Sequence, residues 1–194
     1  MLVLEWNRFR RYLMTPEIET TILAKYSLEM SKEFLESVAL SAVHYLYDNT
    51  QPHSLSVLIT DDAAIKRLNK QYRGLDEVTD VLSFSPNFHG HWKGEIDSSL
   101  PESDIVFPVF ESNFIGDLVL SFPEIRRQSD EFNQTLNNTL AFLLIHGILH
   151  LKGYDHSTKE EQKEMQSVEL DVMTHLEQSV KIIKQMYNKN TGKH

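Results

Sequence analysis

The stretch LSVLITDDAAIKRLNKQYRG, residues 55–74, decides which fold the rest of the chain can take. Its first six residues are rich in Leu, Val and Ile, which is typical of a short buried strand. Asp61 and Asp62 follow as good N-cap residues for a helix, and Gly74 stands where that helix would end. The stretch therefore predicts a strand that leads directly into a helix, the unit of a layered fold.

Strand and helix patterns alternate on both sides of this unit. Further strand candidates are residues 2–6, 79–86 and 114–123, and prolines stop the last two. Helical periodicity covers residues 17–47, 123–134, 136–152 and 157–186. About four strands interleaved with helices predict an α+β (α/β) architecture, with one sheet covered mainly on one side by helices.

The length of 194 residues favours one domain over residues 1–194 with room for one insertion. Residues 87–113 contain Pro, Gly and Ser without a sustained period, so we expect a loop insertion there. A loop of this length inside a domain is usually functional or disordered. From about residue 187 onward we expect a frayed C-terminal tail.

The composition excludes several classes of protein. The chain has no cysteine, which rules out disulfides, thiolate metal sites and cysteine nucleophiles. A net charge of −9 argues against coating nucleic acid through bulk charge, although it leaves room for a local basic patch. Because no run of about 18 apolar residues occurs, we expect a cytoplasmic protein that makes no membrane contact.

Three of the nine histidines fall within HGILHLKGYDH, residues 146–156. At about 100° per residue, His146 and His150 differ by about 40° and stand on one helix face, one turn apart. On a continuing helix His156 would lie too far away to join them. Gly153 can end the helix and turn the chain back, which would bring His156 over the first two imidazoles.

Three neutral imidazoles would hold zinc and leave its fourth position open to water, which is the arrangement of a catalytic site. The spacing therefore predicts one zinc ion on His146, His150 and His156. The alternative is that His146 and His150 face the core, and that His156 is a surface residue that flanks the helix.

The spacing HxxxHxxGxxH resembles the signature of the metzincin metalloproteases, with one change. Their general base, the glutamate that follows the first histidine, is Gly147 here. The full string HGILHLKGYDH more closely resembles the signature HGxLHLxGYDH of the YbeY family, bacterial endoribonucleases of rRNA maturation. Two other segments also resemble that family in its order: LNKQYRGLDEVTDVLSF at 68–84 and IGDLVLS at 115–121. The insertion at 87–113 departs from it.

The resemblance implies a single metal-dependent hydrolase domain in which a small mixed sheet packs with about five or six helices. It also implies zinc on the three histidines, a functional arginine at Arg73, and precursor small-subunit rRNA near its 3′ end as the substrate. The expected partners are therefore rRNA and the small ribosomal subunit, and we expect no DNA. The activity implied is a zinc-dependent endoribonuclease that prefers single strands, in which Arg73 and His146 are the catalytic residues.

Arg73 has independent support in the segment KRLNKQYR at 66–73, which holds four basic residues and no acid. An arginine there can grip a phosphate through two hydrogen bonds, with Arg67 and Lys70 as further RNA-binding candidates. The alternative is that these residues form the solvated face of an amphipathic helix. Two other function classes stay open: a noncatalytic ribosome-assembly factor that contains zinc, and a zinc peptidase.

Acidic residues in the strand candidates need an explanation, because a carboxylate inside an apolar strand is costly unless it is paired. We expect that Asp80 and Asp117 each have a partner or orient a loop, and a catalytic base is the alternative. Asp155 could support a ligand from next to His156. His89 and His91, in the insertion, are expected to be loop residues.

Overall fold

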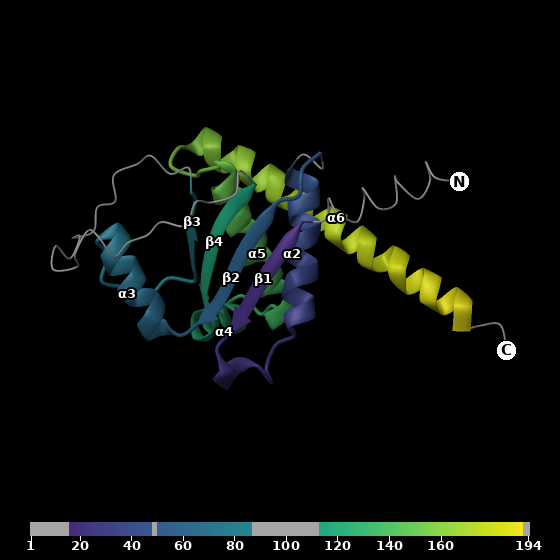
Figure 1. The fold of residues 1–194 in the computed structure, drawn as a ribbon, viewed down its shortest axis with the longest axis horizontal. Coiled ribbons are helices and arrows are strands. Elements are labelled where there is room, and N and C mark those ends of the chain that lie inside the picture. The colour runs from purple at the N-terminus through teal and green to yellow at the C-terminus, as the bar shows by residue number, and fades with distance from the viewer. Residues whose placement is uncertain (1–15, 48–49, 87–112, 192–194) are drawn as a thin grey trace.

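The computed structural model describes residues 16–47, 50–86 and 113–191, with side chains up to residue 177. Its centre is a four-stranded sheet in the order β1-β2-β4-β3 (Figure 1). The strands are β1 (Glu17–Ile22), β2 (Ser54–Thr60), β3 (Val81–Phe84) and β4 (Phe114–Ser121). β1, β2 and β4 are parallel, whereas β3 pairs with β4 in the antiparallel sense. β3 is therefore one edge of a mixed sheet.

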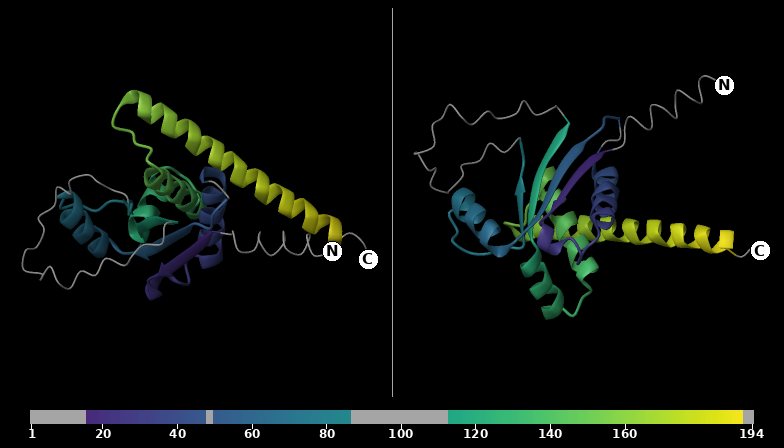
Figure 2. Two further views of the ribbon diagram at one scale, coloured as in Figure 1. Left: turned by 45° about the horizontal axis from the view of Figure 1, so that its top comes forward. Right: turned by 60° about the horizontal axis from the view of Figure 1, so that its bottom comes forward.

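Helices cover the sheet unequally. The described residues form α2 (Lys32–Leu46), α3 (Asp62–Arg73), α4 (Phe122–Glu131), α5 (Leu136–Lys152) and α6 (Lys159–Thr191), and a short 3-10 helix at Ala24–Tyr26. α2 and α5 pack on one face of the sheet, and α3 contacts β3 and β4 on the other. α6 lies across α5 on the side away from the sheet (Figure 2). α5 is thus enclosed between the sheet and α6.

The main core lies between the sheet and the α2–α5 layer. Leu118 and Leu120 of β4 and Leu144 and Ile148 of α5 have no exposed surface. A smaller cluster around Ile65 fills the space under α3. Burial of this apolar surface is the main favourable term that fixes α5 against the sheet.

The observed architecture confirms the predicted α+β fold with a mixed sheet of four strands. The prediction of a helix from residue 17 was wrong at its start, because Glu17–Ile22 is strand β1 and the helix begins only at Lys32. The segment EIETTI contains β-branched residues at alternate positions, and it pairs along its whole length with β2. Tertiary pairing thus overrides the local helical pattern there.

Other boundaries differ modestly from the prediction. α6 runs to Thr191, beyond the expected end at residue 186, and residues 192–194 lie outside the described part. The strand expected at 2–6 and the insertion expected at 87–113, with its two histidines, also lie outside the described residues, apart from Asn113. Among the described helices none combines the length and apolar character needed to cross a bilayer.

Candidate metal centre and its cleft

α5 holds the first two histidines on a rigid, largely buried rod. Thr135 caps its first turn, since its hydroxyl accepts a hydrogen bond from the Asn138 amide at 3.2 Å. Most side chains of α5 are buried between the sheet and α6. His146 and His150 are half-buried on the remaining strip. The helix thus fixes both imidazoles on one face, one turn apart.

Gly153 ends α5 in the way that the third histidine requires. Its φ of +103° lies in the left-handed region, which residues with a Cβ rarely adopt. The amides of Gly153 and Tyr154 donate to the carbonyls of His150 and Leu149, both at 3.0 Å, which forms a Schellman turn. The chain reverses, and the ring of His156 comes to 5.5 Å from that of His146, centroid to centroid.

The three imidazoles meet at one point. One ring nitrogen from each of His146, His150 and His156 lies within 4.8 Å of the other two. The Nε2 atoms of His146 and His150 are 3.1 Å apart. His146 and His150 are half-buried, and His156 is exposed. The cluster therefore has a buried floor and an open side.

Glu169 of α6 supports the cluster from behind and was missed by the sequence prediction. Its Oε1 lies 2.7 Å from Nδ1 of His146, and its residue surface is only 8% exposed. An ionised carboxylate can only accept, so Nδ1 of His146 donates to it, and Nε2 is directed toward His150. The available signal was a carboxylate within the apolar stripe that Met165 and Val172 form on α6.

The donor set fits a metal ion. Burial lowers the pKa of the His150 imidazole, and the neighbouring His146 and His156 lower it further. Nε2 of His150 lies close to Nε2 of His146, and no carboxylate belongs to the group of three nitrogens. Three imidazole nitrogens that converge in this way can hold one cation. Three nitrogen ligands, with no thiolate, suit zinc and other borderline metals better than Mg²⁺ or Ca²⁺.

The histidines open onto a cleft of about 670 Å³. The edge strand β3 and the segment before it form one wall, and the turn at Gly153 and Tyr154 forms another. Arg73, at the C-terminal end of α3, lines the same cleft. Within the described residues its guanidinium makes no ion pair, so its charge is available to a ligand. The structure thus brings Arg73 to the cleft that contains His146, His150 and His156.

The other basic residues of α3 do not line this cleft. Lys66 and Lys70 both pair with Asp76, at 3.7 and 3.6 Å, on the exposed surface. Arg67 is exposed and lies outside the cleft lining. Of the four basic residues in the segment 66–73, only Arg73 lines the cleft that contains the histidines.

Gly147 shows why the glutamate of the metalloprotease signature has no room here. A Cβ on Gly147 would lie 2.8 Å from Cδ2 of Leu118 and 3.2 Å from Cγ2 of Val81. The residue faces the sheet, and its carbonyl accepts a hydrogen bond from Ser83 at 3.1 Å. A glutamate at this position would be pressed into the core, not placed beside the histidines.

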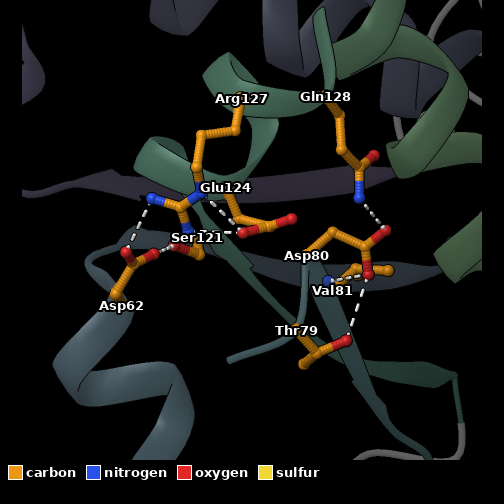
Figure 3. A network of polar contacts seen from close by, with 8 residues as sticks. All are labelled: Asp62, Thr79, Asp80, Val81, Ser121, Glu124, Arg127 and Gln128. Atoms are coloured by element: carbon orange, nitrogen blue, oxygen red, sulfur yellow. Dashed lines mark hydrogen bonds and ion pairs between the residues drawn. The ribbon is translucent and has the colours of Figure 1, made fainter. Parts of the chain in front are cut away.

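Asp80 belongs to a polar network, which matches the expectation that it has a partner. Its Oδ1 accepts from the Val81 amide at 2.7 Å and from the Thr79 hydroxyl at 3.1 Å, and its Oδ2 accepts from Gln128 at 2.9 Å (Figure 3). These contacts tie the start of β3 to α4. Burial raises the pKa of Asp117, whose carboxyl has Ser56 as a partner.

The same network holds the N-terminal end of α3. Ser121 donates to Asp62 at 2.5 Å, and Nη1 of Arg127 lies 2.9 Å from the other carboxylate oxygen of Asp62 (Figure 3). Arg127 also binds Glu124, and Arg126 pairs with Glu29. Both arginines are thus engaged within the fold. α3 is thus anchored at this end, and Arg73 at its other end lines the cleft.

The hydrogen bonds of Asp155 stabilise the turn that follows α5 and not the ring of a histidine. Its carboxylate accepts from the His156 amide and the Ser157 hydroxyl, both at 2.8 Å. These two hydrogen bonds shape the segment between Gly153 and α6. Asp155 therefore contributes to the position of His156 through the backbone.

Comparison with known proteins identifies the family. Residues 19–177 match the family described as Endoribonuclease YbeY. Proteins named Endoribonuclease YbeY from Bacillus cytotoxicus and an Exiguobacterium species are 35% and 38% identical. The matches cover 76% and 75% of this chain, respectively, and 85% of each relative.

A solved solution structure from Thermotoga maritima supports the fold assignment, with a TM-score of 0.50 at 24% identity. The match covers 84% of this chain and 91% of that one. The family match extends from within β1 through the rest of the sheet and α5 into α6. The resemblance seen in the sequence is confirmed, and the chain belongs to the endoribonuclease YbeY family.

Proposed function

We propose that this protein is a zinc-dependent endoribonuclease that cleaves single-stranded RNA and acts in ribosomal RNA processing. Its substrate is precursor small-subunit rRNA, which it cleaves near the 3′ end. The reaction takes place in the cytoplasm, on or near the small ribosomal subunit. The observation that carries the proposal is one cleft that contains both the three converging imidazoles and Arg73, which makes no ion pair with any residue that the structure describes. Membership of an endoribonuclease family supports the choice of RNA.

The cleft contains two features that favour hydrolysis of a phosphodiester: a candidate metal site and an arginine that can bind the phosphate. The chemistry that zinc supplies in three-imidazole sites is Lewis acidity and a lowered pKa of water. Arg73 binds a non-bridging oxygen of the scissile phosphate and offsets the charge that grows there in the transition state. His146, His150 and His156 would hold the metal, and Glu169 holds His146 with Nε2 directed into the cluster.

The structure disfavours the peptidase alternative, because position 147 faces Leu118 and Val81 of the sheet. A noncatalytic assembly factor would share the histidines, and turnover separates it from an enzyme. The test incubates zinc-loaded, nuclease-free protein with structured rRNA and with casein, beside the His146→Ala variant. We expect cleavage of RNA alone, lost in His146→Ala. Cleavage of casein would support a peptidase, and no turnover of either substrate would support an assembly factor.

Replacement of Arg73 tests the phosphate contact. We expect Arg73→Ala to lower the cleavage rate at least 100-fold with unchanged zinc content, because it removes stabilisation of the phosphate and no metal ligand. Arg73→Lys is expected to recover little of the lost cleavage rate, since an ammonium lacks the planar geometry with which a guanidinium donates two parallel hydrogen bonds. Lys32→Ala, on the distant α2, is the matched control. Wild-type rates in Arg73→Ala would show that the phosphate binds elsewhere.

A further inference from the structure

A second hollow lies on the other side of the histidine cluster. It has a volume of about 260 Å³ and is formed between α5 and α6. It shares His146 and His156 with the metal centre, and its other lining residues include Phe142, Gln162, Met165 and Gln166. The two imidazoles therefore form a common wall between this hollow and the cleft of Arg73.

Phe142 forms an aromatic wall of the hollow. It lies on α5, one turn before His146, and the two ring centroids are 6.0 Å apart. Its surface is 42% exposed, although most of α5 is buried. Met165, with 1% exposure, lies at the inner end. The hollow therefore offers an exposed ring face and an apolar, polarisable floor, the surface on which a planar aromatic ligand stacks.

Polar groups at the rim are neutral amides. Gln162 and Gln166 lie one turn apart on α6, and both are exposed. An amide side chain both donates and accepts, so it can bind the edge of a nucleobase. No Lys or Arg occurs among the described residues that line this hollow, and the buried carboxylate of Glu169 does. The side chains of the lining thus offer a phosphate no Lys or Arg partner, whereas the ring of Phe142 and the two amides suit an uncharged ring.

We propose that this hollow binds the base of a nucleotide next to the scissile phosphate, stacked on Phe142 with its edge toward Gln162 and Gln166. The inference rests on the proposed RNA cleavage. A phosphate beside Arg73 and a base in the hollow occupy opposite sides of the shared His146 and His156. A base reaches the hollow only when it is unpaired and turned out of a stack, so the hollow selects single-stranded RNA.

The test combines a protein variant with an RNA variant. The substrate is a single-stranded RNA that the wild type cleaves at one mapped bond, and a matched set lacks the base at one flanking position. We expect Phe142→Ala to raise the KM for intact RNA on the order of 10-fold, the usual loss for one stacked base. With the RNA that lacks the bound base, wild type and Phe142→Ala are expected to be equal. Phe142→Tyr should restore the wild-type KM.

Phe132→Ala is the matched control, because Phe132 is another exposed phenylalanine and lies outside the hollow. Zinc content is measured in every variant. Equal loss of activity in Phe142→Ala on intact and base-deficient RNA, or no loss on either, would overturn the proposal. A lack of cleavage by the wild type would overturn the proposed function instead.

Binding gives a readout that does not depend on turnover. An uncleavable 2′-O-methyl RNA carries the fluorescent base 2-aminopurine at each position in turn. We expect wild type and Phe142→Tyr to quench one position on binding, and Phe142→Ala to leave it bright with a weaker Kd. Identical quenching by wild type and Phe142→Ala would exclude a stacked base, and a peptide ligand would then be the better occupant of the hollow.

Discussion

The histidine cluster and the polar network around Arg127 are both assemblies of charged or polar side chains, but they differ in how completely their groups are satisfied. In the network, the carboxylates face donors (Figure 3). Asp62 accepts a hydrogen bond from Ser121 and pairs with Arg127, and Asp80 accepts a hydrogen bond from Gln128. In the cluster, Nε2 of His146 faces Nε2 of His150. The network is complete among protein groups, whereas the cluster has the geometry to hold a cation.

This difference indicates that the network around Arg127 is structural and that the histidine cluster is functional. A complete network contributes stability and offers little to a ligand. A cluster of imidazole nitrogens that converge on one point can instead hold a cation. Mutations in the two regions should therefore have separable effects, one on metal content and the other on folding.

Loss of a histidine is expected to have the largest effect on the metal. We expect one zinc ion per chain in the wild type, and loss of stoichiometric zinc in each of the alanine variants of His146, His150 and His156. Elemental analysis after dialysis measures it, and His175→Ala on α6 is the control. Full occupancy in all three variants would place the metal elsewhere and would break the contrast with the network.

Replacement of Glu169 is expected to have the next largest effect on zinc binding, because Glu169 orients His146 and is not itself one of the three metal ligands. We expect Glu169→Ala to weaken zinc affinity by about 10- to 100-fold, the usual cost of losing such a partner. Glu169→Gln keeps an acceptor for Nδ1 of His146 and should fall between alanine and wild type. Competition with a chelator measures the affinity, and Glu164→Gln controls for loss of charge on α6. Wild-type affinity in Glu169→Ala would refute the role.

Replacement of Gly153 should have a smaller effect on both metal and fold. The φ of +103° costs a residue with a Cβ about 1 kcal/mol or more, and no atom lies within 4 Å to clash with that Cβ. We therefore expect Gly153→Val to fold and to bind zinc several-fold more weakly, because His156 is displaced. Urea unfolding and zinc affinity measure the two effects. Unchanged affinity would mean that the turn does not position His156.

The smallest effect is expected in the network. Burial alone raises the pKa of Asp62, but hydrogen bonds from Arg127 and Ser121 outweigh it and hold the pKa below its ordinary value. The ionised carboxylate therefore stabilises the fold above its unfolded-state pKa, and this contribution is lost as the pH falls through the folded-state pKa. Since the pair with Arg127 is partly exposed, we expect Asp62→Asn to cost under about 1 kcal/mol at neutral pH.

Thermal unfolding of wild type and Asp62→Asn across a pH series tests this linkage, with zinc content measured in parallel. The two stability curves should converge at acid pH. A reduced zinc content in Asp62→Asn would show that the network and the cluster are not separable.

The sequence predicted those parts of the site that depend on local spacing. His146, His150, Gly153 and His156 lie within eleven residues, and helix geometry together with the turn at Gly153 brings the three histidines together. The position of Arg73 at the end of its helix could be foreseen for the same reason. Most of the strand and helix order followed from periodicity, because each segment carries its own apolar pattern.

The parts that were missed depend on contacts between distant segments. Glu169 is 23 positions from His146 in the sequence, and only the packing of α6 on α5 joins them. Strand β1 was taken for a helix because its partner β2 lies more than 30 positions away in the chain. The pairing of Arg127 with Asp62 is likewise a product of tertiary structure. Local patterns carry no information about such partners.

The contact of Glu169 with His146 has a consequence for how the chain folds and survives. It joins two segments, the end of α5 and the middle of α6, at the point where a metal would bind. A ligand that binds only the folded state adds about 2.7 kcal/mol of stability at 100 times its dissociation constant. The supply of metal in the cell would then act as a control on the lifetime of the protein, because a chain starved of zinc would release α6 more readily and meet proteases sooner.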